Sequence, residues 1–409
     1  MKDIFYQNKK TIILKILLFI VGFSIPISLA FNSISLGVLF LFSFGFLKQE
    51  SYRNLLNSKE VYLYYLVFFL IQSISIFYTS DKELGFETVK QNSVFLILPI
   101  AFINLKGQIS KKSVKLVILG LYLAVISTLF IAISNLIIKA INGGIPFSEF
   151  FRESFVDNGI YDIHVPYLSM LIVFLFICII KIDFIKNKKR NRQFKIGSLF
   201  VFIVSIFFLS GIMSILILSI FSISLFFKSS YSKTVKTVTS IFAIIIVVIG
   251  LGYLKNTKRI DHVRGSEHIL YRVQNFLNSS DSTRKENWKS VTKVITLNTF
   301  FGVGADGGLQ FLQRERQINS EPYINKHNAH NDILEILLRY GVFGLGIYLI
   351  LIYKLSNNSI QNKDYFFKWL LVVFIISGIT ESYLQRQIGL TFFVFFSLLL
   401  YSNNTKIEE

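Results

Sequence analysis

The residue types best suited to catalysis gather in the polar run 326–332, which leads directly into an apolar segment. His327 and His330 lie three residues apart in this run, and His330-Asn331 is followed by nine residues and then by Gly341-x-x-Gly344. An imidazole changes its charge near neutral pH and can accept a proton from a hydroxyl group. The spacing favours a polar site where the chain enters a membrane, although a histidine that is merely solvated at the interface would have the same spacing.

Two ionisable residues follow His330 within the apolar segment. Glu335 and Arg339 stand four positions apart, which places them on one face of an expected helix. Ionisable side chains at membrane depth normally face the protein interior or a water-filled cavity. We therefore expect His330, Glu335 and Arg339 to line one polar site, with the amide of Asn331 orienting the imidazole.

The histidine pattern does not indicate a metal site or a cofactor. His327 and His330 are three residues apart, and no third histidine or cysteine follows at a spacing typical of metal ligands. The order of serine, histidine and aspartate residues along the chain indicates no hydrolytic triad either.

The composition indicates an all-α polytopic membrane protein. Of 409 residues, 53% are apolar and only 16% are charged, and the chain contains 43 Phe but only 5 Pro. Many segments approach the ~20 apolar residues that a helix needs to cross a bilayer. The net charge of +19 first indicates anchoring to membrane lipids at the cytoplasmic face, and only then an anionic ligand; a nucleic-acid partner is not expected.

About twelve membrane-spanning helices are expected along the chain. Their approximate ranges are 11–31, 33–47, 62–78, 93–105, 115–138, 165–182, 197–211, 212–227, 236–254, 333–353, 365–381 and 388–401. Every second connection is rich in Lys and Arg, including the cluster at 186–195, and the positive-inside rule makes these connections cytoplasmic. Both termini are then cytoplasmic too.

This topology divides a single integrated membrane domain into three parts. Residues 1–254 form an N-terminal bundle of about nine spans, 255–331 form a large and partly helical outer loop, and 332–409 contain the last three spans. The loop holds four of the five histidines and many cations, among them Arg264 and Arg272. No internal repeat is apparent, so a transporter built from repeats receives no support.

Within the large loop, Arg284 and Trp288 lie near an expected helix start. Thr283 and Glu286 fit a capping box, and Trp288 begins an apolar face at helical spacing. A cation beside the free backbone N–H groups of a helix N-terminus can hold phosphate. For one arginine taken alone, an exposed cation on a solvated face is the simpler interpretation.

Four glycines fall in the seven residues 302–308, directly after this expected helix. Glycine allows tight turns and a close approach of backbone to ligand. The segment follows no strand, so it lacks the setting of a dinucleotide-binding loop, and a structural turn is the favoured interpretation.

The His-Asn and Gly-x-x-Gly spacing at 330–344 resembles the signature of the O-antigen ligase and O-antigen polymerase superfamily. The Arg-x-x-x-Trp pattern at 284–288 and the Gly-x-Gly pattern at 302–304 are similar to the rest of that domain. A layout of twelve spans with a large outer loop between late spans is also similar. The motifs cover about residues 284–344, whereas the layout concerns the whole chain.

The resemblance implies a metal-independent glycosyltransferase of the bacterial inner membrane whose active site faces the periplasm. The donor would be a glycan on undecaprenyl diphosphate, and the acceptor would be lipid A-core for a ligase or another glycan for a polymerase. His330 would act as the base on the acceptor hydroxyl or would contact the leaving diphosphate, and Arg284 would hold that diphosphate. Further substrate contacts are expected from Asn331, Arg272, Arg264, Trp288, His327, Glu335 and Arg339.

The chain departs from the family pattern at one place. Many relatives carry an arginine after a serine at the outer end of a middle span, whereas residues 210–213 read Ser-Gly-Ile-Met. A second phosphate contact would then come from Arg272, Arg264 or Arg152. A flippase or other transporter of lipid-linked glycans would explain the spans and the interior charges, but not a large loop that carries most of the histidines.

Overall fold

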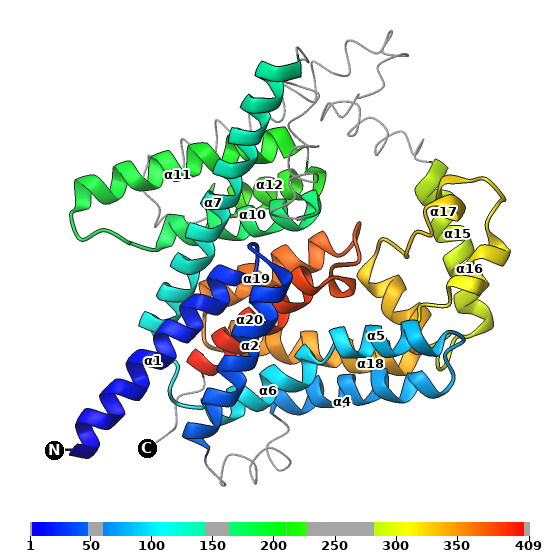
Figure 1. The fold of residues 1–409 in the computed structure, drawn as a ribbon, viewed down its shortest axis with the longest axis horizontal. Coiled ribbons are helices and arrows are strands. Elements are labelled where there is room, and N and C mark those ends of the chain that lie inside the picture. Colours follow the sequence, from blue (N-terminus) through cyan, green and yellow to red (C-terminus); the bar gives the residue numbers. More distant parts are fainter. Residues whose placement is uncertain (1, 48–59, 144–162, 210, 227–281, 405–409) are drawn as a thin grey trace. The chain divides into compact units, whose positions relative to one another are not determined.

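The computed structural model describes residues 2–47, 60–143, 163–209, 211–226 and 282–404, and every regular element in these ranges is a helix (Figure 1). The chain divides into two compact units. Unit 1 comprises Met1–Ala124 with Ser282–Glu409, and unit 2 comprises Val125–Asp281. The motifs at 284–344 all lie in unit 1.

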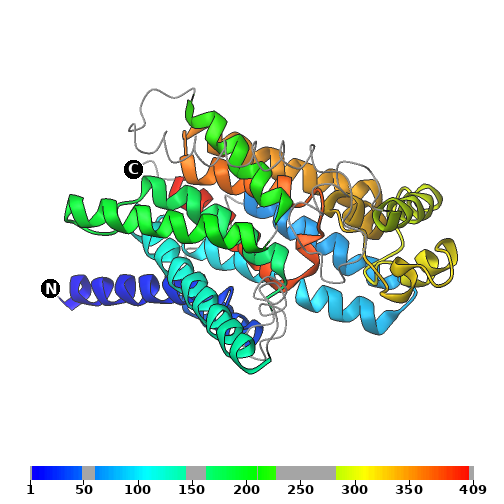
Figure 2. The ribbon, with the colours of Figure 1, turned by 90° about the horizontal axis from the view of Figure 1, so that it is seen from above.

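Unit 1 is a helical bundle in which α18 packs against α4 and α19, while α6 packs against α2, α4 and α20. Its helices are α1 (Lys2–Ser24), α2 (Leu29–Ser43), α4 (Val61–Ile74), α5 (Lys82–Gln91), α6 (Val94–Asn104), the first part of α7 (Lys111–Gly143), α15 (Ser282–Leu297), α16 (Leu309–Glu315), α17 (Glu321–Ile324), α18 (Asp332–Gln361), α19 (Tyr365–Ser377) and α20 (Gln387–Asn404). Short 3-10 turns follow α2 (Phe44–Phe46), follow α4 (Ser75–Phe77) and precede α20 (Tyr383–Gln385). In both views, α15, α16 and α17 gather at one end of α18 (Figures 1 and 2).

Unit 2 contains α10 (Val165–Lys181), which packs against α11 (Lys188–Leu209) and α12 (Ile212–Phe226). Most of the basic cluster at 186–195 is therefore helical, because α11 begins nine residues before the expected span at 197. Asn191 fixes the turn between α10 and α11: its side-chain oxygen accepts from the backbone N–H groups of Phe184 and Ile185, both at 3.1 Å.

Helices overlap eleven of the twelve expected spans, and the remaining one, 236–254, lies outside the described residues. Within the described ranges, four helical stretches are long and apolar enough to cross a membrane: Leu29–Phe46, Lys82–Asn104, Lys111–Asn135 and Asp332–Gln361. Shorter apolar helices occur at Val61–Phe77, Val165–Lys181, Met213–Leu225 and Tyr365–Ser377. The total of twelve and the two sides of the membrane stay predictions.

Several boundaries differ from the sequence-based expectation. The first apolar helix ends at Ser24 and not near residue 31, because Pro26 disfavours helix and Ser28 then caps the next one by accepting from Phe31 N. The polar connection before α6 contains α5, whose N-terminus is capped by Asp81 through Leu84 N at 3.0 Å. The apolar pattern along the chain does not reveal such caps. The expected ranges therefore extended the first helix too far and did not include α5.

Helix α18 bends sharply at Gly341, where φ is 61° and ψ is −165°. The bend exposes backbone oxygen atoms that the glycine-rich segment uses: Val303 N donates to Leu338 O at 2.8 Å and Gly304 N to Arg339 O at 3.0 Å. A Cβ atom on Gly341 would lie 2.1 Å from Phe300 O, so only glycine fits. The glycine-rich segment is thus the expected structural turn, and it is bound to the kink of α18.

The described part of the large loop has a small core of its own. Val291, Val294 and Ile295 of α15 are buried against Leu312 of α16 and Leu338 of α18. This apolar contact holds α15 beside the start of α18 and thereby places Trp288 next to the histidine segment.

Candidate functional site

His330 lies immediately before α18 and its imidazole contacts a carboxylate. The Nδ1 atom of His330 is 3.2 Å from Oε1 of Glu381, and the two side chains are 27% and 12% exposed. Glu381 follows α19, so two consecutive antiparallel helices bring the pair together across 51 residues of sequence. When Nδ1–H donates to the carboxylate, Nε2 is left as an acceptor that can take a proton from a substrate hydroxyl.

The backbone of His330 is held in an uncommon conformation. Its φ is +46°, in the left-handed region, and its N–H donates to Oδ1 of Asn328 at 3.0 Å. A non-glycine residue in this region costs on the order of 1–3 kcal/mol, and such residues concentrate at functional sites. The surrounding contacts, described next, offset this cost.

Asn331 has a different role from the expected one. It is the N-cap of α18: its Oδ1 accepts from Leu334 N at 2.9 Å, and its Nδ2 donates to Ile379 O at 2.9 Å. The expectation that Asn331 orients the imidazole is therefore corrected. Asn331 fixes the start of the helix and ties it to the end of α19, while Glu381 contacts the imidazole.

His327 packs edge-on against His330, with ring centroids 5.0 Å apart. Burial lowers the pKa of His327, and the neighbouring His330 lowers it further. An imidazole that stays neutral at this place does not repel a proton that arrives on His330.

Helix α15 supports the histidine segment through two adjacent side chains. Trp288 Nε1 donates to Ala329 O at 2.9 Å, and Asn287 Nδ2 donates to Asn328 O at 2.7 Å. The described contacts differ from the capping box expected at the start of α15: Thr283 donates to Glu321 at 3.0 Å, and Glu286 accepts from Gln317 N at 3.3 Å. Arg284 is half-buried in the first turn of α15, one turn before Trp288.

Arg316 also holds the histidine segment in place, although the sequence shows it only as one loop cation among several. Its guanidinium donates to Pro322 O at 3.0 Å, Asn287 Oδ1 at 2.7 Å and His327 O at 2.6 Å. Burial lowers the pKa of Arg316 to about 10, although Glu335 and Glu286 act to raise it. Arg316 is thus a buried clamp on the histidine segment, and its charge is turned inward.

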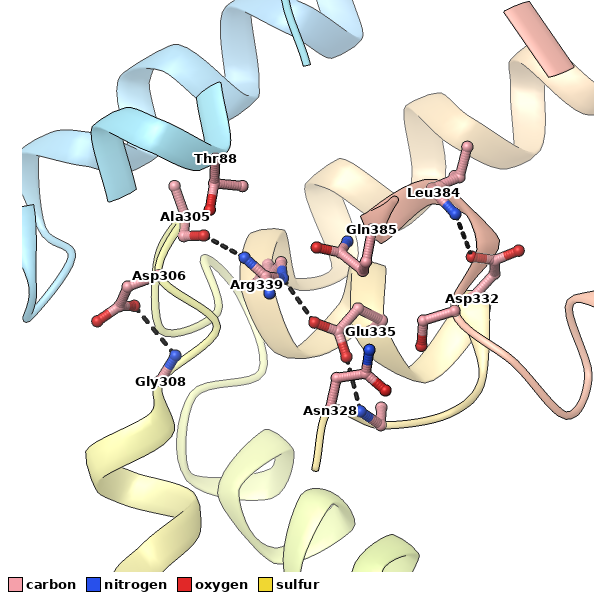
Figure 3. A network of polar contacts seen from close by, with 12 residues as sticks. Thr88, Ala305, Asp306, Gly308, Asn328, Asp332, Glu335, Arg339, Leu384 and Gln385 are labelled. Carbon is pink, nitrogen blue, oxygen red and sulfur yellow. Dashed lines mark hydrogen bonds and ion pairs between the residues drawn. The ribbon is translucent and has the colours of Figure 1, made fainter. Parts of the chain in front are cut away.

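Glu335 and Arg339 form the expected pair, with Nε of Arg339 2.6 Å from Oε1 of Glu335 (Figure 3). The other Glu335 oxygen accepts from Ala329 N at 2.8 Å, and Arg339 also donates to Ala305 O. The pair therefore ties the histidine segment and the glycine-rich segment to α18. The contacts of the His330 imidazole go to Glu381 and His327 and not to this pair.

Asp306, between the glycines, attaches the glycine-rich segment to the start of α5. Its carboxylate accepts from Ser80 Oγ at 2.5 Å, Asp81 N at 2.9 Å and Gly308 N at 3.0 Å. Burial raises the pKa of Asp306, but these hydrogen bonds to the charged form outweigh it, so the pKa lies below the ordinary value of 3.8.

Several expected contacts cannot be placed. Arg264, Arg272 and Arg152 lie outside the described residues, as does Ser210. Among the residues that the structure describes, no group of three or more His, Cys, Asp or Glu side chains is arranged to hold a metal ion.

Sequence reasoning missed Glu381, although a signal was present. Spans 333–353 and 365–381 were expected to be consecutive, so the start of the first and the end of the second must share one face of the membrane. An acidic residue at the end of an apolar span is rare enough to prompt a search for its partner.

Part of the chain matches a known protein family. Residues 166–349 match the family model described as O-antigen ligase, a range that includes Arg284, Trp288, His330 and both glycines of the 330–344 pattern. No curated protein matches the chain. The family match confirms the resemblance to the O-antigen ligase and polymerase superfamily.

Proposed function

Because residues 166–349 match the O-antigen ligase family, we propose that this membrane protein is a glycosyltransferase of the bacterial inner membrane. It moves a glycan from undecaprenyl diphosphate to an acceptor hydroxyl at the periplasmic face, and the acceptor is lipid A-core. The observation that carries the proposal is the contact of His330, which lies in the family motif at the capped start of α18, with Glu381.

In the proposed reaction, the acceptor oxygen forms a bond to the anomeric carbon of the donor while the bond from that carbon to the diphosphate breaks. The hydroxyl proton goes to Nε2 of His330, and Glu381 stabilises the imidazolium that forms. General-base assistance of this kind is typically worth about 10²–10⁴-fold in rate. The leaving group is undecaprenyl diphosphate, and cations that face its developing charge stabilise the transition state.

Arg284 is the described cation proposed for that diphosphate, because it lies in the first turn of α15. Arg284→Lys is expected to lose most activity at an equal protein level, because a point charge does not replace a planar fork on a phosphate. Full activity of this variant would assign Arg284 to the solvated face of α15.

The direct test is glycan transfer by the purified protein from a defined polyprenyl-diphosphate donor, measured with a chelator present to check the proposed metal independence. His330→Ala is expected to abolish transfer and Glu381→Gln to reduce kcat by about 10²-fold or more. His327→Ala is the matched comparison and is expected to lower transfer less than His330→Ala, because His327 is the adjacent histidine but lies outside the motif. A dead His327→Ala with an active His330→Ala would assign the base to His327, and activity of both would remove the base from the proposal.

The polymerase reading differs from the ligase only in the acceptor. A deletion strain separates them: polymer that is made but not attached to lipid A-core indicates a ligase, whereas single repeat units on the acceptor indicate a polymerase. Glycan that stays on the cytoplasmic side would contradict both and would indicate a flippase.

A further inference from the structure

A cavity of about 600 Å³ lies within unit 1 beside the histidine segment. Ten of its fifteen lining residues are polar or charged. The full lining is Ser33, Leu36, Gly37, Leu84, Glu87, Thr88, Lys90, Gln91, Ser93, Val94, Ile97, Asn328, Arg339, Gln385 and Gln387. Its volume falls within the range of about 300–1,000 Å³ that is usual for small-molecule sites.

The charges on the cavity wall are paired. Arg339 is bound by Glu335 at 2.6 Å, and Lys90 is 3.2 Å from Glu87. Since both cations already have a carboxylate partner, the wall presents little uncompensated positive charge to a diphosphate. The cavity is therefore suited to an uncharged polar ligand.

The remaining polar groups on the wall are amides and hydroxyls. Within the described part of the chain, neither the side-chain amide of Gln385 nor Nδ2 of Asn328 has a hydrogen-bond partner, while Asn328 Oδ1 is used by His330 N. Amides donate and accept in one plane, which is the chemistry that recognises neighbouring hydroxyl groups of a sugar. Apolar side chains such as Leu36 and Val94 supply the surface for the C–H face of the ring.

The wall is connected to the proposed catalytic pair at two points. Asn328 binds the backbone of His330 at 3.0 Å, and Gln385 follows Glu381 by four residues in the turn that leads to α20. The Gln385 carbonyl accepts from Gln91 Nε2 of α5 at 2.9 Å, which fixes this turn against the cavity. Figure 3 shows Gln385 and Asn328 on either side of Glu335, close to Arg339.

We propose that this cavity is a binding subsite for an uncharged saccharide unit of a substrate glycan, with Gln385 and Asn328 as its hydrogen-bonding groups. The inference rests on the proposed transferase function. Asn328 lines the cavity and binds the backbone of His330, so a sugar held here lies beside the histidine segment. The unit belongs to either the donor glycan or the acceptor glycan, whose hydroxyl chemistry is the same.

Gly37 allows the cavity to be filled without disturbing the fold. A Cβ atom added at Gly37 meets no atom within 4 Å, and the same is true at Gly346 in α18, which does not line the cavity. Gly37→Trp is therefore compared with Gly346→Trp. Gln385→Ala is compared in the same way with Gln361→Ala, which changes an exposed glutamine at the far end of α18.

The purified full-length variants are assayed in two ways. Equilibrium dialysis uses two tritium-labelled probes from the source bacterium, the repeat-unit oligosaccharide and the core oligosaccharide, each released from its lipid. Transfer kinetics give separate KM values for donor and acceptor. We expect Gly37→Trp to weaken binding of one probe, and to raise the KM of the matching substrate, by at least about tenfold. Gln385→Ala should change the same two quantities by about threefold to tenfold, as the loss of one neutral hydrogen bond implies. Both control variants stay within about twofold of wild type.

Each outcome decides a separate question. The probe and the KM that respond identify the donor or the acceptor as the source of the sugar. If wild type transfers glycan and Gly37→Trp changes neither KM, the subsite is wrong while the transferase stands. Undecaprenyl phosphate, added as a competitor of the lipid-linked donor, tests for a lipid site. If Gly37→Trp weakens only this competition and leaves the binding of both probes unchanged, the cavity holds a lipid chain and the inference is overturned. If wild type binds a probe in a Gly37-dependent way but transfers nothing, the subsite stands and the proposed function fails.

Discussion

Substitution of Gly341 by alanine tests whether the bend in α18 is required. The backbone at Gly341 has φ 61° and ψ −165°, a region that is essentially reserved for glycine and costs other residues about 1–3 kcal/mol. The new Cβ atom would also lie 2.1 Å from Phe300 O, so the pairing of Val303 and Gly304 with α18 must shift. Two lost hydrogen bonds add about 1–3 kcal/mol, for a total of about 2–6 kcal/mol.

Gly346→Ala is the matched control for this substitution. Gly346 lies five residues further along the same helix, and a Cβ atom there meets nothing within 4 Å. Alanine should leave stability unchanged or raise it by about 0.5–1 kcal/mol, because glycine is unfavourable in a helix interior. Thermal unfolding in one detergent, at equal protein concentration, compares the two variants with wild type. Equal midpoints for Gly341→Ala and Gly346→Ala would refute the strained bend and its pairing with the glycine-rich segment.

Three further predictions concern the surroundings of the site. Trp288→Phe removes the donor to Ala329 O and is expected to cost about 1–3 kcal/mol and to lower transfer, whereas Trp369→Phe, measured per folded protein, should leave transfer near wild type. Asp306→Asn should destabilise the protein at neutral pH but not in acid. Because the folded-state pKa of Asp306 is depressed, the stability that its carboxylate contributes is present above the ordinary pKa of 3.8 and is lost as the pH falls through the lower folded-state pKa. The unfolding midpoints of variant and wild type should therefore converge in acid. Cysteine labels at 186–195 should react only from the cytoplasm and labels at 270–325 only from outside; labelling of 186–195 from outside would overturn the proposed topology.

The helical class and the position of the central motif could be predicted from the sequence, because both depend on local patterns. Apolar runs mark the helices, and the spacing from His330 to Gly344 is visible in the chain itself. The Glu335–Arg339 pair was also predictable, since residues four apart on a helix are neighbours. Caps such as Ser28 and Asp81 could not be predicted in this way. A serine or aspartate caps a helix only when it stands at the helix start, and the apolar pattern does not locate that start to the residue.

Contacts between distant segments were the part that local patterns could not supply. Glu381 reaches His330 only because α18 and α19 are antiparallel neighbours, and Arg316 looks like any loop cation until its carbonyl partners are known. The role of Asn331 was misassigned for a related reason. An amide next to a histidine in sequence suggests a contact, but the first residue of a helix turns its side chain toward its own N–H groups.

The spacing between His330-Asn331 and Gly341 has a physical explanation in this fold. Nine residues separate Asn331 from Gly341, and they form a half-helix of about 14 Å whose two ends are both fixed. At one end Asn331 caps the helix beside His330, and at the other end Gly341 bends it so that the glycine-rich segment can pair with it. One residue more or fewer would turn one end by about 100° against the other and would separate the histidine from the contacts of α15. The motif therefore specifies the length and the two ends of the half-helix that holds His330 in its left-handed conformation against Glu381.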